Sequence, residues 1–175
     1  YVTFKITVVD QYKNAPTLKI NPMSVKKGQK FNVDFNLTNN PGIASLKVKV
    51  NYDETLLKLV QVKYNSKLGG NSQQPQILKS PFILNWFNGA ENFNGDDVFA
   101  TVTFEVIATQ EETVDTTFDI TYDNDDIFNI NEENVGLKLD IGTITINNQM
   151  GGKVLLEMSD DFSYVQGSID GFDGN

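Results

Sequence analysis

The chain has 175 residues, 39% of them hydrophobic, and its 14 basic and 23 acidic residues give a formal net charge of −9. Every basic residue is lysine, and the sequence contains no arginine, histidine or cysteine. These absences exclude histidine-based triads, cysteine nucleophiles, His- or Cys-ligated zinc and disulfides, and the acidic balance argues against partners such as nucleic acid or an anionic membrane surface.

The first predicted element is a strand at residues 1–9, where every second residue from Val2 to Val8 is apolar. Residues 10–16 are polar and end in Ala-Pro, which is typical of a connector. We therefore expect residues 1–15 to be an upstream strand and connector. The strand either closes a preceding module or adds to this domain.

Apolar and polar residues alternate in five later segments, which predicts half-buried strands with one face on a core. These segments are residues 31–37, 46–52, 100–106, 118–122 and 137–146. The alternation changes phase at Gly142, which suggests a bulge or kink there.

Turn residues separate the strands. The Asn-Asn-Pro-Gly run at residues 39–42 precedes the second of them. An Asn-Gly pair at 94–95 lies between strands expected at 82–87 and 98–107, and this pair favours a tight hairpin. No convincing stretch has helical periodicity, and the sequence therefore predicts an all-β sandwich at residues 16–149, followed by an extension or linker at 150–175.

Five motifs in order resemble the cohesin domain of bacterial, cellulosome-type scaffoldins. They are residues 26–33 (KKGQKFNV), 41–46 (PGIASL), 51–59 (NYDETLLKL), 97–106 (DVFATVTFEV) and 141–146 (IGTITI). Within them Gly42 allows a backbone conformation that a Cβ would oppose, and Asp53 is a turn former. Each motif alone is weak, but their order and spacing are specific.

The resemblance implies a nine-stranded jelly-roll β-sandwich that is not an enzyme and needs no cofactor. It also implies a protein–protein docking role in assembling extracellular, secreted or cell-surface complexes that degrade polysaccharide. The partner would be a dockerin-bearing enzyme or scaffold protein, with calcium on the dockerin side. In the family the dockerin lies on a flat face of four strands, of which residues 45–51, 83–87 and 101–105 would be three.

Strand alternation then names the side chains expected on this face, with Leu84 and Trp86 pointing inward. Ile83, Phe87 and Phe99 would form an apolar centre with a polar rim, which is typical of an interface. The expected dockerin-binding residues are Ser45, Lys47, Lys49, Asn51, Ile83, Asn85, Phe87, Asn88, Glu91, Phe99, Thr101, Thr103 and Glu105.

Lys47 and Lys49 depart from the acidic or amide residues that better-known cohesins present on this strand. On an acidic protein they would favour an acidic patch on the dockerin, which tunes specificity and association rate. The simpler interpretation is that both are solvated lysines.

Three other interpretations remain open. A carbohydrate-binding module shares the jelly-roll fold, but the single tryptophan, Trp86, falls on the inward phase. A generic surface adhesin module would look similar. A glycosidase needs two placed carboxylates, and the candidates Asp53, Glu54, Glu91 and Glu105 have no recognisable catalytic context.

An acidic segment follows the strand at 118–122. Asp123, Asp125 and Asp126, with Glu132 and Glu133 nearby, offer oxygen ligands that suit calcium. Ile127 occupies a position that the EF-hand pattern reserves for a ligand. We therefore expect a solvated acidic loop and no metal site.

Overall fold

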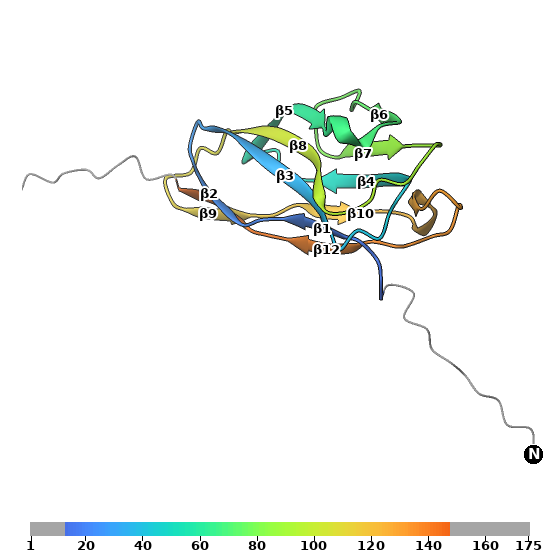
Figure 1. The fold of residues 1–175 in the computed structure, drawn as a ribbon. Coiled ribbons are helices and arrows are strands. Elements are labelled where there is room, and N and C mark those ends of the chain that lie inside the picture. Colours follow the sequence, from blue (N-terminus) through green and yellow to red (C-terminus); the bar gives the residue numbers. More distant parts are fainter. Residues whose placement is uncertain (1–12, 148–175) are drawn as a thin grey trace, which may run out of the picture.

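The computed structural model describes residues 13–147, in which thirteen strands are joined by turns and two short 3₁₀ helices, η1 (Ser66–Leu68) and η2 (Asn124–Asp126) (Figure 1). The all-β class is therefore confirmed, whereas the count of nine strands is not. No helix in this part of the chain has the length and apolarity to cross a bilayer. The predicted strand at 1–9 and the extension at 150–175 lie outside the described residues, so the three-part division of the chain stays a prediction.

One five-stranded sheet, which we call the β3 sheet, has the strand order β12-β1-β3-β8-β5. Its strands are β1 (Thr17–Ile20), β3 (Lys30–Thr38), β5 (Leu57–Tyr64), β8 (Asp97–Val106) and β12 (Lys138–Ile141). β1 and β12 pair in parallel, and the other neighbours are antiparallel.

A second sheet, which we call the β4 sheet, has the order β10-β4-β7-β6, and β11 also pairs with β4 (Figure 1). Its strands are β4 (Ser45–Asn51), β6 (Asn71–Gln73), β7 (Phe82–Phe87), β10 (Asp119–Thr121) and β11 (Ile127–Phe128). All of these pairings are antiparallel.

A third, small sheet contains β2 (Met23–Lys26), β13 (Ile144–Asn147) and β9 (Val114–Thr116) in the order β2-β13-β9. The chain passes from the β3 sheet into it at two facing points, Asn21-Pro22 and Gly142. A Cβ at Gly142 would collide with the backbone nitrogen of Pro22. The kink expected at Gly142 is therefore confirmed, and it marks a change of sheet.

The core lies between the two larger sheets, where the alternating apolar residues meet. Phe82 and Trp86 of the β4 sheet face Phe104 and Phe99 of the β3 sheet, with ring centroids 6.3 and 6.2 Å apart. All four rings are almost completely buried, and burial of a ring of this size contributes about 2 kcal/mol or more. This layering confirms the sandwich.

The hairpin expected at Asn94-Gly95 is wrong. Gly95 does turn the chain with a φ of 80°, but β7 belongs to the β4 sheet and β8 to the β3 sheet. Residues 88–96 therefore cross from one sheet to the other. A local turn signal specifies a reversal of direction and does not specify which strand receives the chain.

Two turn predictions from the sequence are confirmed. Gly42 has a φ of +114°, and a Cβ there would lie 2.5 Å from the Asn94 side-chain oxygen. The Asp53 carboxylate accepts hydrogen bonds from the backbone nitrogen and the hydroxyl of Thr55, at 2.8 and 2.6 Å, and these bonds lower the pKa of Asp53. These turns deliver the chain into β4 and out of it.

Candidate functional site

The outer face of the β4 sheet collects side chains from four neighbouring strands. Its register places Lys47 opposite Asn85, and Asn85 opposite Gln73. Lys49 lies between Ile83 on β7 and Thr121 on β10. We call this surface the β4 face, and its outward side chains are Lys47, Lys49, Asn51, Asn71, Gln73, Ile83, Asn85, Phe87, Asp119 and Thr121.

Apolar side chains gather on and around this face. Of the seven exposed large apolar residues in the described part of the chain, five belong to the β4 face or to the loops that leave it. Ile83 and Phe87 are 45% and 46% exposed. Ile77 and Leu78 lie in the β6–β7 loop, and Ile130 follows β11. Scattered exposed apolar residues are ordinary, but a cluster with a polar rim is typical of an interaction surface.

One apolar group lies where β7 ends. The rings of Phe87 and Phe128 lie 6.1 Å apart and are tilted by 52°. With Ile130 and Gly89 they line an open hollow of about 390 Å³. This end of the face therefore offers an aromatic surface that is only partly covered.

The two lysines of β4 differ in their surroundings. The Lys47 ammonium donates to both oxygens of the Asp126 carboxylate, at 3.0 and 3.3 Å. The same carboxylate accepts a long bond from the Asp123 backbone nitrogen. Lys49 is exposed, and among the described residues it has no ion pair. The Lys47 ammonium is thus already paired with a carboxylate of the same chain, whereas the Lys49 ammonium has no ion-pair partner among the described residues.

A tyrosine beneath the edge of the face fixes β6 against β7. The Tyr64 hydroxyl donates to the Gln73 carbonyl and accepts from the Asn85 backbone nitrogen, both at 2.9 Å. The Asn85 side chain donates to the Gln73 side chain, also at 2.9 Å. Burial raises the pKa of Tyr64 to about 12, so the hydroxyl keeps its proton and its donor role at all physiological pH values.

The β6–β7 loop, residues 74–81, rises beside the face. It encloses an open hollow of about 650 Å³ together with side chains of β4, β6 and β7. The hollow is lined by Lys47, Gln73, Gln74, Pro75, Gln76, Ile77, Pro81, Phe82, Ile83 and Asn85. The β4 face is thus bounded by this loop at one end.

The structure places several expected residues together on this face. Lys47, Lys49, Ile83 and Phe87 point outward as expected, and Leu84 and Trp86 are buried. Asn51 and Asn85 are half-buried on the same side, and Glu91 is exposed in the turn after β7. The outward orientation of the strand residues is confirmed, whereas Glu91 lies outside the strands of the face. The role of all these residues in binding stays a prediction.

Two expected contact residues are buried, so their placement on an exposed surface is wrong. Ser45 is 6% exposed because β11 pairs beside it, and its hydroxyl donates to the Asp126 carbonyl at 3.2 Å. Asn88 is 4% exposed, and its amide donates to the Leu68 carbonyl and accepts from the Ala90 nitrogen. Both side chains hold neighbouring loops in place.

The four residues expected from β8 are not on this face. Phe99 is completely buried, because a bulge makes Phe99 and its neighbour Ala100 both point into the core. Thr101, Thr103 and Glu105 lie on the outer side of the β3 sheet. There the hydroxyls of Thr101 and Thr103 contact side chains of β3 at 2.6 and 2.8 Å.

The strand expected at 118–122 is present as β10, but sequence reasoning placed none of its residues on the face, and it missed β6 altogether. Asn71 and Gln73 come from β6, and Asp119 and Thr121 come from β10. β6 is too short and too polar to show alternation. The adjacent apolar pair in the β6–β7 loop, Ile77 and Leu78, was a readable signal, because it lies between prolines in a polar segment.

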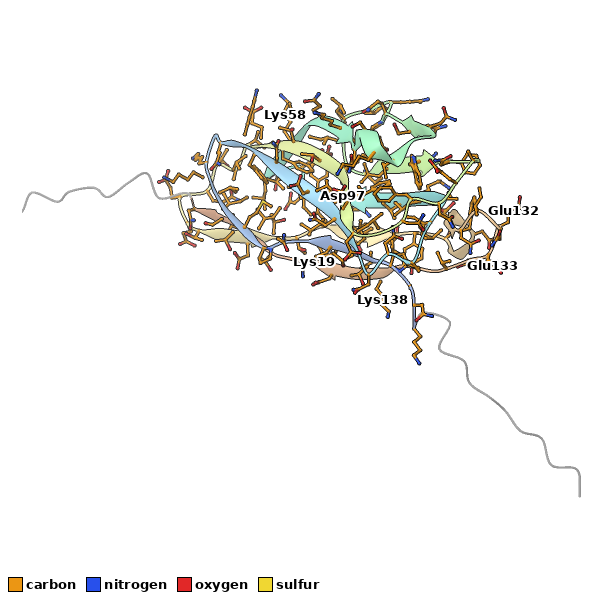
Figure 2. All side chains as sticks on the ribbon, in the orientation of Figure 1. Lys19, Lys58, Asp97, Glu132, Glu133 and Lys138 are labelled. Carbon is orange, nitrogen blue, oxygen red and sulfur yellow. The ribbon has the colours of Figure 1, made fainter. Side chains whose placement is uncertain are left out.

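The acidic residues between Asp123 and Glu133 do not gather at one place, and their carboxylates contact different partners. Asp126 faces Lys47. Glu132 and Glu133 lie together in the loop beyond β11 (Figure 2), where Glu133 accepts a hydrogen bond from the Asn129 amide at 2.8 Å. Within residues 13–147 no three acidic side chains form a group that could hold a metal ion.

The family model of the cohesin domain matches residues 16–139, and no curated protein matches the sequence. A chain of the Coh-OlpC–Doc435 complex, a type I cohesin–dockerin complex from Clostridium thermocellum, is similar with a TM-score of 0.68 at 14% identity, covering 82% of this chain and 100% of that one.

Two cohesins solved without a named partner are also similar in structure. The seventh ScaB type I cohesin of Pseudobacteroides cellulosolvens has a TM-score of 0.60 at 19% identity, covering 77% of this chain and 94% of its own. The non-cellulosomal cohesin of the archaeon Archaeoglobus fulgidus has a TM-score of 0.59 at 20% identity, covering 75% and 91%. At such identities the likeness concerns the fold.

Proposed function

Since this chain belongs to the cohesin domain family, we propose that it is a non-catalytic docking module that binds a dockerin domain of another protein. The partner would be an enzyme or a scaffold protein, and calcium would be bound on the dockerin side. The complex would assemble outside the cell, either secreted or attached to the cell surface, and would serve polysaccharide degradation.

The β4 face is the surface we assign to the dockerin. The observation that carries this assignment is the gathering of exposed apolar residues there, with Ile83 and Phe87 on the same outward side of β7. Amides and lysines surround them, and an apolar centre with a polar rim is how protein interfaces are built. The backbone hydrogen bonds of a sheet lie in its plane, so recognition on the face would use side chains.

A catalytic role has no comparable support. The four carboxylates weighed from the sequence are dispersed over a turn, a crossing loop and the β3 sheet. Asp53 and Glu54 have structural partners, Thr55 and the Ser80 backbone nitrogen. Trp86 is buried, so it offers no stacking surface to a sugar.

Binding to purified dockerin domains tests the proposal. The panel should hold dockerins from enzymes and from non-enzymatic proteins, because one similar cohesin is described as non-cellulosomal. Calorimetry with calcium should find a binding dockerin, and a chelator should abolish binding by unfolding that dockerin. Absence of binding across the panel, or retardation of the chain in a polysaccharide affinity gel, would contradict the proposal.

A further inference from the structure

The loop between β6 and β7, residues 74–81, carries an apolar side chain that the fold leaves uncovered. Ile77 is 67% exposed, the highest value among the large apolar residues in the described part of the chain, and Leu78 beside it is 45% exposed. Neither belongs to the apolar cluster that forms the core. Ile77 therefore contributes little to the core, and with Leu78 it forms an apolar surface that a partner could cover.

Polar contacts hold this loop at both ends. At its start the Tyr64 hydroxyl donates to the Gln73 carbonyl at 2.9 Å. At its end the Ser80 backbone nitrogen donates to the Glu54 carboxylate at 3.0 Å, and the Ser80 hydroxyl accepts from the Tyr52 backbone nitrogen at 2.9 Å. Because these anchors do not involve Ile77, the loop keeps its position whichever side chain stands there.

Ile77 forms one wall of the 650 Å³ hollow, and Ile83 of the β4 face forms another. Pro75 and Pro81 add apolar surface, while Lys47 and Asn85 are shared with the β4 face. The hollow is thus continuous with the surface assigned to the dockerin. A partner lying on β4 and β7 would pass directly over its opening.

The charge around the hollow favours an uncharged occupant. Lys47 is the only charged residue lining it, and its ammonium is already paired with the Asp126 carboxylate at 3.0 Å. An acidic side chain entering the hollow would have to compete with Asp126, whereas an apolar side chain would cover Ile77 and Ile83. The occupant that fits is therefore apolar.

We propose that the β6–β7 loop determines specificity, and that the hollow between Ile77 and Ile83 takes an apolar side chain of the dockerin. This inference rests on the proposed function and extends the docking face beyond its strands. Dockerins with an apolar residue at the matching place would be selected over dockerins with a polar residue there.

The test uses the full chain, calcium and the tightest-binding dockerin from the panel. Ile77→Ser should weaken binding about tenfold, and Ile77→Leu should restore it. The matched control is Leu139→Ser, because Leu139 is 39% exposed on β12 of the other sheet and its replacement should leave affinity unchanged. Thermal melting of each variant checks that the fold is intact.

Hydrogen exchange gives a second readout that needs no substitution. Amides of residues 76–79 should exchange more slowly in the complex than in the free chain. Equal affinities for Ile77→Ser and Leu139→Ser, with Phe87→Ala weakened, would overturn the role of the loop and leave the proposed function standing.

Three other outcomes would overturn the proposed role of the hollow. If no dockerin binds the unaltered chain, the proposed function and this inference both fail. Self-association that Ile77→Ser abolishes would assign the hollow to a second copy of this chain and would overturn the proposal. Binding of a soluble oligosaccharide that Ile77→Ser abolishes would overturn it equally.

Discussion

Replacing Phe87 by alanine is the sharpest test of the β4 face. Phe87 is 46% exposed, and an aromatic side chain offers about 150–250 Å² in total, so a partner would cover about 90 Å² of its ring. At about 25 cal/mol per Å² this coverage is worth about 2 kcal/mol. Because alanine keeps the β-carbon and part of the contact, we expect a loss of about 1–2 kcal/mol, which is about a 5- to 30-fold weaker affinity.

Calorimetry or surface plasmon resonance with a binding dockerin measures this loss. Thr103→Ala is the matched control, since Thr103 projects from the β3 sheet and its hydroxyl contacts only Asn32 among the described residues. The loss of the ring contact with Phe128 should cost the fold about 1 kcal/mol or less, and a urea titration checks it. Unchanged affinity in Phe87→Ala, together with weaker binding in Thr103→Ala, would move the docking surface to the other sheet and refute the reasoning.

Three further predictions concern stability, and urea titration measures each. Asn88→Ala should lower the free energy of unfolding by about 1–3 kcal/mol, because this buried amide makes two hydrogen bonds to loop backbone. Surface substitutions usually change it by about 0.5 kcal/mol or less, so a loss that small would contradict the buried role of Asn88. Gly42→Ala should cost about 1–3 kcal/mol more than Gly28→Ala, since both have positive φ but only the first places a Cβ against Asn94; equal losses would rule out the collision. Tyr64→Phe should cost about 1–2 kcal/mol at neutral pH for its lost hydrogen bonds. The pKa of Tyr64 rises from 10.0 to about 12 on folding, so its contribution is full below pH 10 and is lost as the pH approaches 12, and the gap between the unaltered chain and Tyr64→Phe should narrow over that range.

Much of the fold could be predicted from the sequence, because the alternation of apolar and polar residues matches the observed burial along the longer strands. β3 and β4 each keep strict alternation over seven or more residues, and all their apolar side chains are buried, although the polar Ser45 of β4 is buried as well. Gly42 was recognisable as a special position because it ends an Asn-Asn-Pro-Gly turn signal and leads into a strand. On β7 the inward pair Leu84 and Trp86 fixed the phase, and with it the outward Ile83 and Phe87.

β8 shows why the candidate site was only partly predictable. Its alternation is correct from Ala100 onward, but the bulge at Phe99 puts two successive side chains into the core. Alternation also reports which side of a strand is buried without reporting which sheet holds the strand. In a sandwich the outward residues of the two sheets have the same pattern and lie on opposite surfaces. The prediction that Thr101 and Thr103 point outward was therefore correct, but they point outward from the β3 sheet and not from the β4 sheet.

The short strand β6 was unpredictable for a different reason. Its three residues are all polar and exposed, too few to establish a period, whereas β10 lies within the strand expected at 118–122. β6 forms because β7 presents unpaired backbone groups at its edge, and the chain arriving there satisfies those groups. Such pairing depends on tertiary position, and no local residue preference encodes it.

The parallel pairing of the first two described strands with the last two has a mechanical consequence. β1 pairs in parallel with β12, and β2 with β13, so the start of β1 and the end of β13 point to opposite ends of the sandwich (Figure 1). A pull applied at these two points acts along the strands and loads all the hydrogen bonds of both ladders in shear at the same moment. Antiparallel neighbours pulled from one end would instead open bond by bond. A module built in this way can transmit tension through a chain of modules while its lateral face stays in place to hold a partner.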